Sequence, residues 1–314
     1  MISSPSELLQ QVNCDLKDKY LFGHATLLES LVVAYLARGH VLVEGPPGTS
    51  KTMTARLLAK LLAKKFRRIQ FTSDLLPSDI IGSHIYSQAK SDFVFIEGPI
   101  FADVILADEI NRTPPRTQSA LLEAMEERQV TAEGSLMKLS PDFFVVATQN
   151  PQDYEGTFPL PEVQLDRFLL KITLQHSPAE VEVKILEQFL SGVLPVDEGK
   201  IPSLQIDRSR IDSTIASIRC DPSLIRWITQ LLQKTRTSPH VAVGSSLRGG
   251  LALFKCAQVW ACLQGREFIT PDDLKRFVVP SLRHRIKLSP EAQLNQVSES
   301  SLLEELMQQV PFPT

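Results

Sequence analysis

The segment Gly45-Pro46-Pro47-Gly48-Thr49-Ser50-Lys51-Thr52 constrains this sequence most, because it matches the phosphate-binding pattern G-x-x-x-x-G-K-[ST] at every position except Ser50. It follows an apolar run at 41–43 and precedes an amphipathic helical pattern at 53–62, the strand-loop-helix order that such a loop requires. The loop N–H groups would face a polyphosphate, Lys51 would neutralise its oxygens, and Thr52 would bind Mg²⁺. We therefore expect residues 45–52 to bind the phosphates of a nucleotide. A plain glycine and proline turn is the alternative.

Ser50 is the departure from the pattern, which has glycine at this position. A side chain is tolerated there if the backbone avoids a positive φ angle. We therefore expect Ser50 to keep a negative φ and to leave the binding mechanism unchanged.

The composition predicts a soluble, globular protein of two domains, since the 314 residues are 43% hydrophobic and 22% charged. No apolar run approaches the roughly 20 residues that span a bilayer, and the N-terminus lacks the pattern of a secretory signal. We therefore expect a cytoplasmic protein with no membrane span. The net charge of −3 disfavours nucleic acid as a partner. The spacing of the four cysteines and six histidines predicts neither a disulfide framework nor a zinc site.

Apolar runs alternate with helical patterns between residues 26 and 175, which predicts an α/β fold with a parallel sheet flanked by helices. The five candidate strands are 41–43, 68–71, 104–107, 143–147 and 169–174. Two segments interrupt this pattern, an insert near 83–97 that reads as a hairpin or loop and a hairpin near 129–139. We expect both to lie outside the sheet.

Beyond residue 176 the strand signals fade and helical periodicity dominates. The sequence therefore predicts an α/β nucleotide-binding domain at 1–176, a helix and loop-rich connector at 177–213, and an all-helical lid domain at 214–314. Helices are expected near Pro178, over 224–232 and 247–263, and after Thr270 as N-cap. The tail from 289 to 314 is polar, and we expect its last residues to be disordered.

Four apolar residues at 104–107 lead directly into Asp108 and Glu109, which is a Walker B pattern. A buried strand would deliver Asp108 to its tip to hold Mg²⁺ and nucleotide, while Glu109 would orient and deprotonate the attacking water. A strand that ends in a solvated acidic turn is the alternative, and the upstream loop weighs against it.

A third apolar strand ends in Gln149-Asn150-Pro151. The neutral amide of Asn150 could hydrogen-bond the γ-phosphate or the attacking water without adding charge beside Glu109. A turn-forming asparagine before proline explains the same residues equally well.

These motifs are joined by further matching segments, and together they resemble the MoxR family of AAA+ ATPases from about Leu21 to Leu288. The resemblance is carried by 39–45, 74–79, 98–102, 106–112, 117–125, 147–151, 158–162 and 164–168. It implies a P-loop AAA+ module with a helical lid, assembled as a homo-oligomeric and usually hexameric ring that holds each nucleotide between subunits. It also implies that the two excursions face the ring interior or a partner.

The resemblance implies roles for three more residues: Asn150 as sensor 1, Arg167 as the arginine finger of a neighbouring subunit, and Arg248 as sensor 2. A guanidinium group is permanently charged and matches phosphate oxygens, so supplying it from a neighbour couples hydrolysis to assembly. A surface pair of Asp166 with Arg167 and a solvated Arg248 are the alternatives, and Arg112 is a second candidate for the contact in trans. Whether Arg248 acts on its own or a neighbour's nucleotide stays open.

Two positions depart from the family pattern besides Ser50. Leu247 stands where the family commonly has proline, and His24 stands where glutamine usually follows the glycine of the base-binding region. The adenine is expected to lie near Leu21 and Phe22, held by backbone and apolar contacts.

We therefore expect an ATP- and Mg²⁺-dependent ATPase that remodels, matures or activates protein complexes in a chaperone-like way. The resemblance implies a protein partner, often one with a von Willebrand factor A domain. A slow-hydrolysing assembly scaffold is the first alternative. A DNA motor is the second, although Lys138 is the only basic residue in the hairpin at 129–139.

Overall fold

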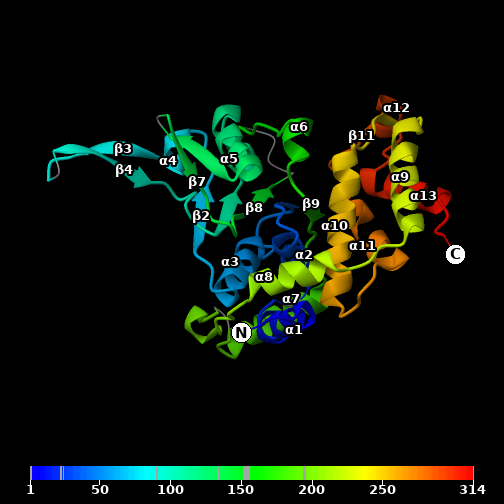
Figure 1. Ribbon diagram of the computed structural model, residues 1–314, viewed down its shortest axis with the longest axis horizontal. Helices are drawn as coiled ribbons and strands as arrows, with labels where there is room; N and C mark the ends of the chain where they lie inside the picture. The colour runs from blue at the N-terminus through cyan, green and yellow to red at the C-terminus, as the bar shows by residue number, and fades with distance from the viewer. Residues whose placement is uncertain are drawn as a thin grey trace.

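The computed structural model describes residues 2–21, 23, 25–89, 91–132, 134–150, 156–193 and 196–313. Its centre is a five-stranded sheet in the order β2-β5-β8-β1-β9, with every neighbouring pair parallel (Figure 1). The strands are β2 (Phe66–Gln70), β5 (Val104–Asp108), β8 (Phe144–Gln149), β1 (Val41–Glu44) and β9 (Leu170–Thr173). The predicted α/β fold with a parallel five-stranded sheet is confirmed.

Alternate residues of the central strands enter two separate hydrophobic cores, as the two-residue period of a strand requires. Val41 and Val43 pack with α2 (Ala25–Leu36) and α3 (Lys51–Leu61) on one face. Leu42 packs on the other face with α4 (Pro77–Ile81) and α5 (Pro115–Glu127). Helices on both faces explain why the strand sequences are continuous apolar runs.

The parallel register brings the carboxyl ends of three strands to one edge of the sheet. Glu44 at the end of β1 lies opposite Gln149 at the end of β8, and Ala107 of β5 lies opposite Ala147 of β8. Because the phosphate loop follows β1 and the acidic pair closes β5, this edge gathers the predicted chemistry in one place.

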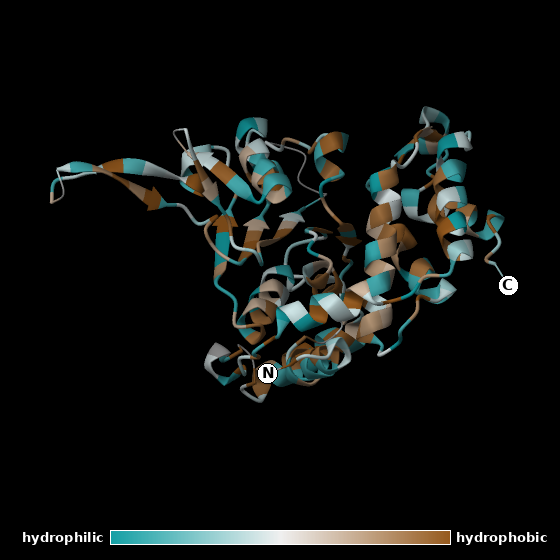
Figure 2. Cartoon of the chain, in the orientation of Figure 1, coloured by the Kyte–Doolittle hydropathy of each residue, from teal (hydrophilic) through white to brown (hydrophobic). Residues whose placement is uncertain are grey.

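Both predicted excursions form two-stranded antiparallel hairpins outside the main sheet. The first pairs β3 (Gly82–Ser87) with β4 (Asp92–Glu97) and projects far from the body of the molecule (Figure 1). The second pairs β6 (Gln129–Ala132) with β7 (Ser135–Lys138). Figure 2 shows hydrophobic residues along the projecting hairpin, where Tyr86 and Phe93 are more than half exposed.

The C-terminal region is built mainly from α9 (Pro222–Thr237), α10 (Leu247–Leu263), α11 (Pro271–Leu282), α12 (Pro290–Leu294) and α13 (Glu299–Gln309). Thr270 and Asp273 form the capping box that starts α11, so the predicted N-cap is confirmed. The expectation of an all-helical lid is wrong in one detail. The short strands β10 (Val241–Val243) and β11 (Lys287–Leu288) pair there, because the chain runs extended beside itself before α10 and after α11.

The tail is described as far as residue 313, and its apolar side chains pack on the lid. The indole N–H of Trp227 donates to the Val310 carbonyl at 2.9 Å, and the Trp227 and Phe312 rings stack with centroids 4.0 Å apart. Burial of these apolar groups outweighs the polar composition of the segment.

The remaining elements connect the α/β part to the C-terminal region or lie at the margins of the two. They are α1 (Pro5–Val12), the π-helix η1 (Asn13–Lys17), the 3₁₀ helices η2 (Ile110–Arg112) and η3 (Glu198–Lys200), α6 (Glu162–Leu165), α7 (Ala179–Leu190) and α8 (Arg208–Ala216). Helix α8 crosses the predicted boundary at residue 213. It is anchored on the α/β part, where Arg208 donates to the carbonyls of Tyr35 and Leu36. No helix in the described ranges has the length and apolar character needed to cross a membrane.

His40 is buried between the sheet and α5 and is held as a neutral imidazole. Its Nδ1 accepts from the Val145 N–H at 3.0 Å, so Nε2 carries the proton that faces the Met125 carbonyl at 3.1 Å. Burial lowers the pKa of His40 from 6.5 to about 4. The folded state therefore binds fewer protons than the unfolded state between these two values.

We expect the contribution of His40 to the free energy of unfolding to be fully present well above pH 6.5. This contribution should be lost as the pH falls from 6.5 towards 4. His40 alone should account for a loss of about 2 to 3 kcal/mol between pH 7 and pH 4.5. Denaturant unfolding at both pH values measures it. His40→Gln should flatten this dependence, whereas His176→Gln at an exposed position should not. Equal pH dependence in the wild type and His40→Gln would contradict this assignment.

Candidate active site

A cavity of 430 Å³ lies at the carboxyl edge of the sheet. It is lined by residues 47–53 of the phosphate loop and the start of α3, and by Arg68, Asp108, Glu109, Thr148, Gln149 and Asn150. The loop residues, the acidic pair and Asn150, singled out separately in the sequence, thus meet around one space. Gly45 and Pro46 do not line the cavity, but their carbonyls support the loop.

Glycine at position 45 is explained by a close approach, because a β-carbon there would lie 2.9 Å from the Leu174 carbonyl oxygen. Ser50 shows the opposite case, a side chain where the pattern has glycine. It adopts φ 54° and ψ 18°, the left-handed conformation, so the expectation of a negative φ is wrong. The turn into α3 requires this conformation whatever residue occupies the position, at a cost of about 1 kcal/mol for serine.

The Lys51 ammonium group is turned back onto its own loop. It donates to the carbonyls of Gly45 at 2.7 Å and Pro46 at 2.8 Å, and lies 3.3 Å from the Thr49 hydroxyl. Burial lowers the pKa of Lys51, and the nearby Asp108 and Glu109 oppose that shift. The lysine charge thus sits on neutral carbonyl groups, which a phosphate anion can replace as partners.

The backbone of the loop fits an anion. In the described chain, no backbone carbonyl accepts from the N–H groups of Gly48 or Ser50, and on entering α3 the first bond outside the helix ladder is from Thr54 to the Ser50 carbonyl. These donors precede or begin the 11-residue helix α3, whose N-terminus carries partial positive charge. Unpaired N–H groups beside a lysine form the cradle that phosphate oxygens bind.

Asp108 ends the fully buried strand β5 and is held on both of its oxygens. Oδ1 accepts from the Thr148 hydroxyl at 2.6 Å, and Oδ2 accepts from Arg68 Nε at 3.0 Å and a terminal nitrogen at 2.6 Å. The guanidinium group of Arg68 thus faces this carboxylate. Together with the Thr52 hydroxyl at the cavity wall, the oxygen donors fit Mg²⁺.

Glu109 is oriented by its neighbours although it lies in a strained, left-handed conformation with φ 57°. Its Oε2 accepts from Gln70 Nε2 and from Arg112, each at 3.0 Å, and its N–H donates to the Thr148 hydroxyl at 2.9 Å. Arg112, the second candidate for a contact in trans, is thus bonded within its own subunit. A carboxylate fixed at the cavity wall can act as a general base.

Sequence reasoning missed Arg68, Gln70 and Thr148. Arg68 and Gln70 are two residues apart on β2, so they point to one side of the strand, and Gln70 lies opposite Asp108 in the register. The polar spacing was visible in the sequence, but the pairing of β2 with β5 was not.

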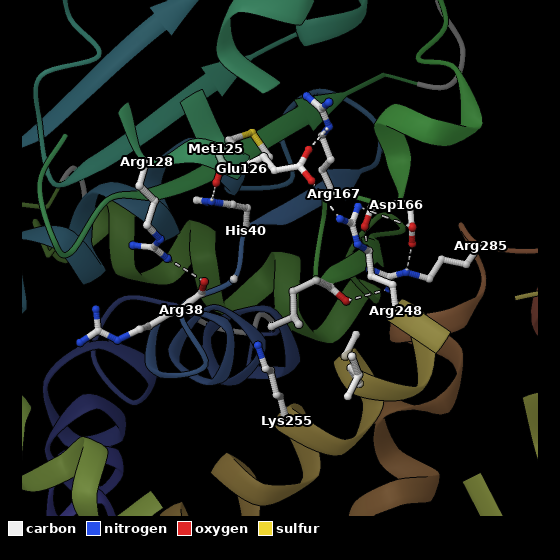
Figure 3. Close-up of a pocket in the computed structure, with 14 residues that line it drawn as sticks. Arg38, His40, Met125, Glu126, Arg128, Asp166, Arg167, Arg248, Lys255 and Arg285 are labelled. Carbon is white, nitrogen blue, oxygen red and sulfur yellow. Dashed lines mark hydrogen bonds and ion pairs between the residues drawn. The ribbon is translucent and has the colours of Figure 1, made fainter. Parts of the chain in front are cut away.

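Arg167 and Arg248 do not line this cavity. They meet instead in a second pocket of 320 Å³, between the α/β part and the first turn of α10 (Figure 3). Arg167 Nε lies 2.9 Å from one oxygen of Glu126, and a terminal nitrogen of Arg248 donates to the other oxygen at 2.9 Å. Asp166 pairs with the buried Arg285 at 2.6 Å, so the simple Asp166–Arg167 pair does not form.

The region predicted to hold the adenine is described only in part. Phe22 and His24 lie outside the described residues. Leu21 is buried, and a β-carbon at Gly23 would lie 2.7 Å from the Val181 side chain of α7. The described residues contain no group of three or more acidic, histidine or cysteine side chains that could hold a metal alone. A magnesium ion here would depend on phosphate oxygens as further ligands.

Comparison with known proteins shows to which class of protein this chain belongs. Residues 40–170 match the model of the ATPase family associated with various cellular activities (AAA), and residues 233–306 match the AAA lid domain. The chain is therefore an AAA+ nucleotide-binding module with its lid.

Relatives matched over most of their length define the family. The chain is 36% identical to Chaperone MoxR1 of Mycobacterium tuberculosis, covering 94% of this chain and 80% of that protein. It is 29% identical to Protein MoxR of Paracoccus denitrificans, with 86% of each chain covered. It is 44% identical to the uncharacterized protein YeaC of Bacillus subtilis, over 90% of this chain and 88% of that one. The chain belongs to the MoxR family of AAA+ ATPases.

A solved structure agrees over nearly the whole length. A protein of Cytophaga hutchinsonii, described as a candidate ATPase, superimposes with a TM-score of 0.89 at 34% sequence identity. The match covers 99% of this chain and 97% of that one. The α/β part and the lid are thus both shared with this protein.

Proposed function

We propose that the chain hydrolyses ATP to ADP and phosphate with Mg²⁺ and uses the energy to remodel, mature or activate protein complexes. The observation that carries the proposal is the meeting of Lys51 with Asp108 and Glu109, from two separate segments, around one cavity of nucleotide size. The name of the relative Chaperone MoxR1 supports the remodelling role.

The chain's own groups divide the work. Lys51 would exchange its loop carbonyls for phosphate oxygens, and the loop N–H groups would hold the same oxygens. Thr52 and Asp108 would hold Mg²⁺, which would neutralise charge on the phosphates. Glu109, fixed by Gln70 and Arg112, would remove the proton from the attacking water, and Asn150 would orient that water or the γ-phosphate.

Within a single chain, the nucleotide cavity lacks Arg167 and Arg248, the two arginines predicted to act on the phosphate. Both line the second pocket instead. This separation supports a homo-oligomeric ring, hexameric in our proposal, in which one subunit presents Arg167 and Arg248 to the nucleotide of its neighbour. Arg248 would therefore act in trans, beside Arg167.

The proposal places the protein in the cytoplasm, in keeping with four cysteines that are all free thiols. The partner we propose is a protein that carries a von Willebrand factor A domain. The projecting hairpin, with exposed Tyr86 and Phe93, is a surface on which such a partner could bind.

Purified protein should release phosphate from ATP in the presence of Mg²⁺ and stop when EDTA is added. Lys51→Ala should lower the rate by about 100-fold and weaken ATP binding, because it removes the main positive charge of the cradle. Lys60→Ala, at an exposed position in the last turn of the same helix, is the matched control and should behave as the wild type. Mg²⁺-independent release, or equal rates for Lys51→Ala and wild type, would contradict the proposal.

A further inference from the structure

Glu126 binds two arginines that come from different parts of the molecule. Its Oε2 lies 2.9 Å from Nε of Arg167, which follows α6, and its Oε1 accepts from Arg248 of α10 at 2.9 Å. Figure 3 shows the carboxylate between the two side chains. One acidic group thus links the α/β part to the lid.

Helix stability does not explain these charges. Glu126 lies in the last turn of α5, where the helix dipole disfavours a negative charge, and Arg248 lies in the first turn of α10, where it disfavours a positive charge. The side chains of Glu126 and Arg248 are 36% and 50% exposed. Ion pairs this exposed contribute little to folding stability.

Asp166, the other acidic group that lines the pocket, already has an arginine partner. Asp166 accepts from Arg285, whose side chain is only 3% exposed, and it lies 3.7 Å from a terminal nitrogen of Arg248. Without Glu126, Arg167 and Arg248 would be two like charges in one pocket with no carboxylate between them. Like charges repel, so the two side chains would separate.

The contacts also leave donors available. A guanidinium group has five N–H donors, and the ion pair of Arg167 with Glu126 is made at Nε, 2.9 Å from the carboxylate oxygen. Figure 3 shows the two terminal nitrogens of Arg167 on the side of the guanidinium group that faces away from Glu126. A planar group held from behind by Nε presents its two terminal nitrogens as a fork, the geometry that suits phosphate oxygens.

We infer that Glu126 is a positioning residue, which holds Arg167 and Arg248 as one preformed pair for the phosphate of a neighbouring subunit's nucleotide. This inference rests on the proposed function. Glu126 does not touch the nucleotide of its own subunit, because it is absent from the lining of that cavity. It acts through the two arginines.

The test replaces Glu126 by glutamine, which keeps the size and removes the charge. We expect kcat for ATP hydrolysis to fall about tenfold, since misplaced catalytic groups lose rate in this range or beyond. The dissociation constant of a fluorescent ATP analogue should change less than about twofold, because the subunit's own cradle is intact. The melting temperature should shift by no more than about 4 °C. Glu123→Gln, at an exposed position on the same helix, should leave all three values unchanged.

A double mutant separates positioning from a general structural effect. In an Arg248→Ala background, Glu126→Gln should lower kcat by clearly less than the roughly tenfold expected in the wild type, because only Arg167 is left for it to hold. Losses that multiply in the double mutant, or a single mutant with wild-type kcat, overturn the inference alone. A wild type without ATP turnover overturns the proposed function, and the inference with it.

Discussion

Glu109→Gln should lower steady-state ATP turnover by about 100-fold or more, the range expected when a general base is lost. The glutamine keeps the size of the side chain and one hydrogen-bond acceptor for Gln70 or Arg112, but it cannot take a proton from water. ATP binding should persist, because Lys51 and the loop N–H groups are unchanged. Phosphate release and equilibrium binding of ATP, measured on the same protein, check both halves of this expectation.

Glu304→Gln, at an exposed position on α13, is the control and should match the wild type. Equal and near-zero rates for wild type and Glu109→Gln would instead favour a nucleotide-dependent scaffold that works as an assembly switch. The same variant in ATP should hold its protein partner, so affinity capture with it can identify that partner. An empty capture would weaken the remodelling role while leaving the ATPase assignment in place.

The fold and the cavity could be predicted because their determinants are local in sequence. A buried strand, a glycine-rich turn and a helix in order define the loop from Gly45 to Thr52, and an apolar run before Asp108 defines the tip of β5. Parallel strands have their carboxyl ends at one edge, so these segments had to meet.

The contacts that could not be predicted from the sequence depend on which helices and strands pack against one another. Arg68 reaches Asp108 only because β2 pairs with β5, an order that no spacing along the chain reveals. Glu126 reaches Arg248 across 122 residues of sequence, between two helices whose packing is set by the whole lid. The prediction of a negative φ at Ser50 was wrong for a different reason. The loop geometry fixes this φ angle, and the residue type sets only the conformational energy that it costs.

The placement of Arg167 and Arg248 in a pocket of their own bears on assembly. Arg167→Ala should lower ATP turnover by about 1,000-fold, since arginine fingers contribute 10³ to 10⁵ in rate. If Arg167 acts on the neighbouring subunit, this variant still has an intact cradle and an intact Glu109. The variant Glu109→Gln has the complementary defect, because it keeps both arginines and loses the base.

Mixing the two inactive proteins should therefore restore turnover. In a random ring of equal parts, about a quarter of the interfaces would join a Glu109-bearing site to an intact Arg167, so activity should approach that fraction of wild type. The same mixture made with Arg248→Ala in place of Arg167→Ala tests whether Arg248 also acts in trans. Mixing Arg167→Ala with the double mutant Arg167→Ala/Glu109→Gln is the control, because no interface then has both groups. Recovery in this control would show that turnover does not need Arg167. No recovery in the first mixture would show that Arg167 serves its own subunit or that the subunits do not exchange. Co-purification of an untagged variant with a tagged one distinguishes those two outcomes, since only exchanged subunits can pair Glu109 of one chain with Arg167 of another.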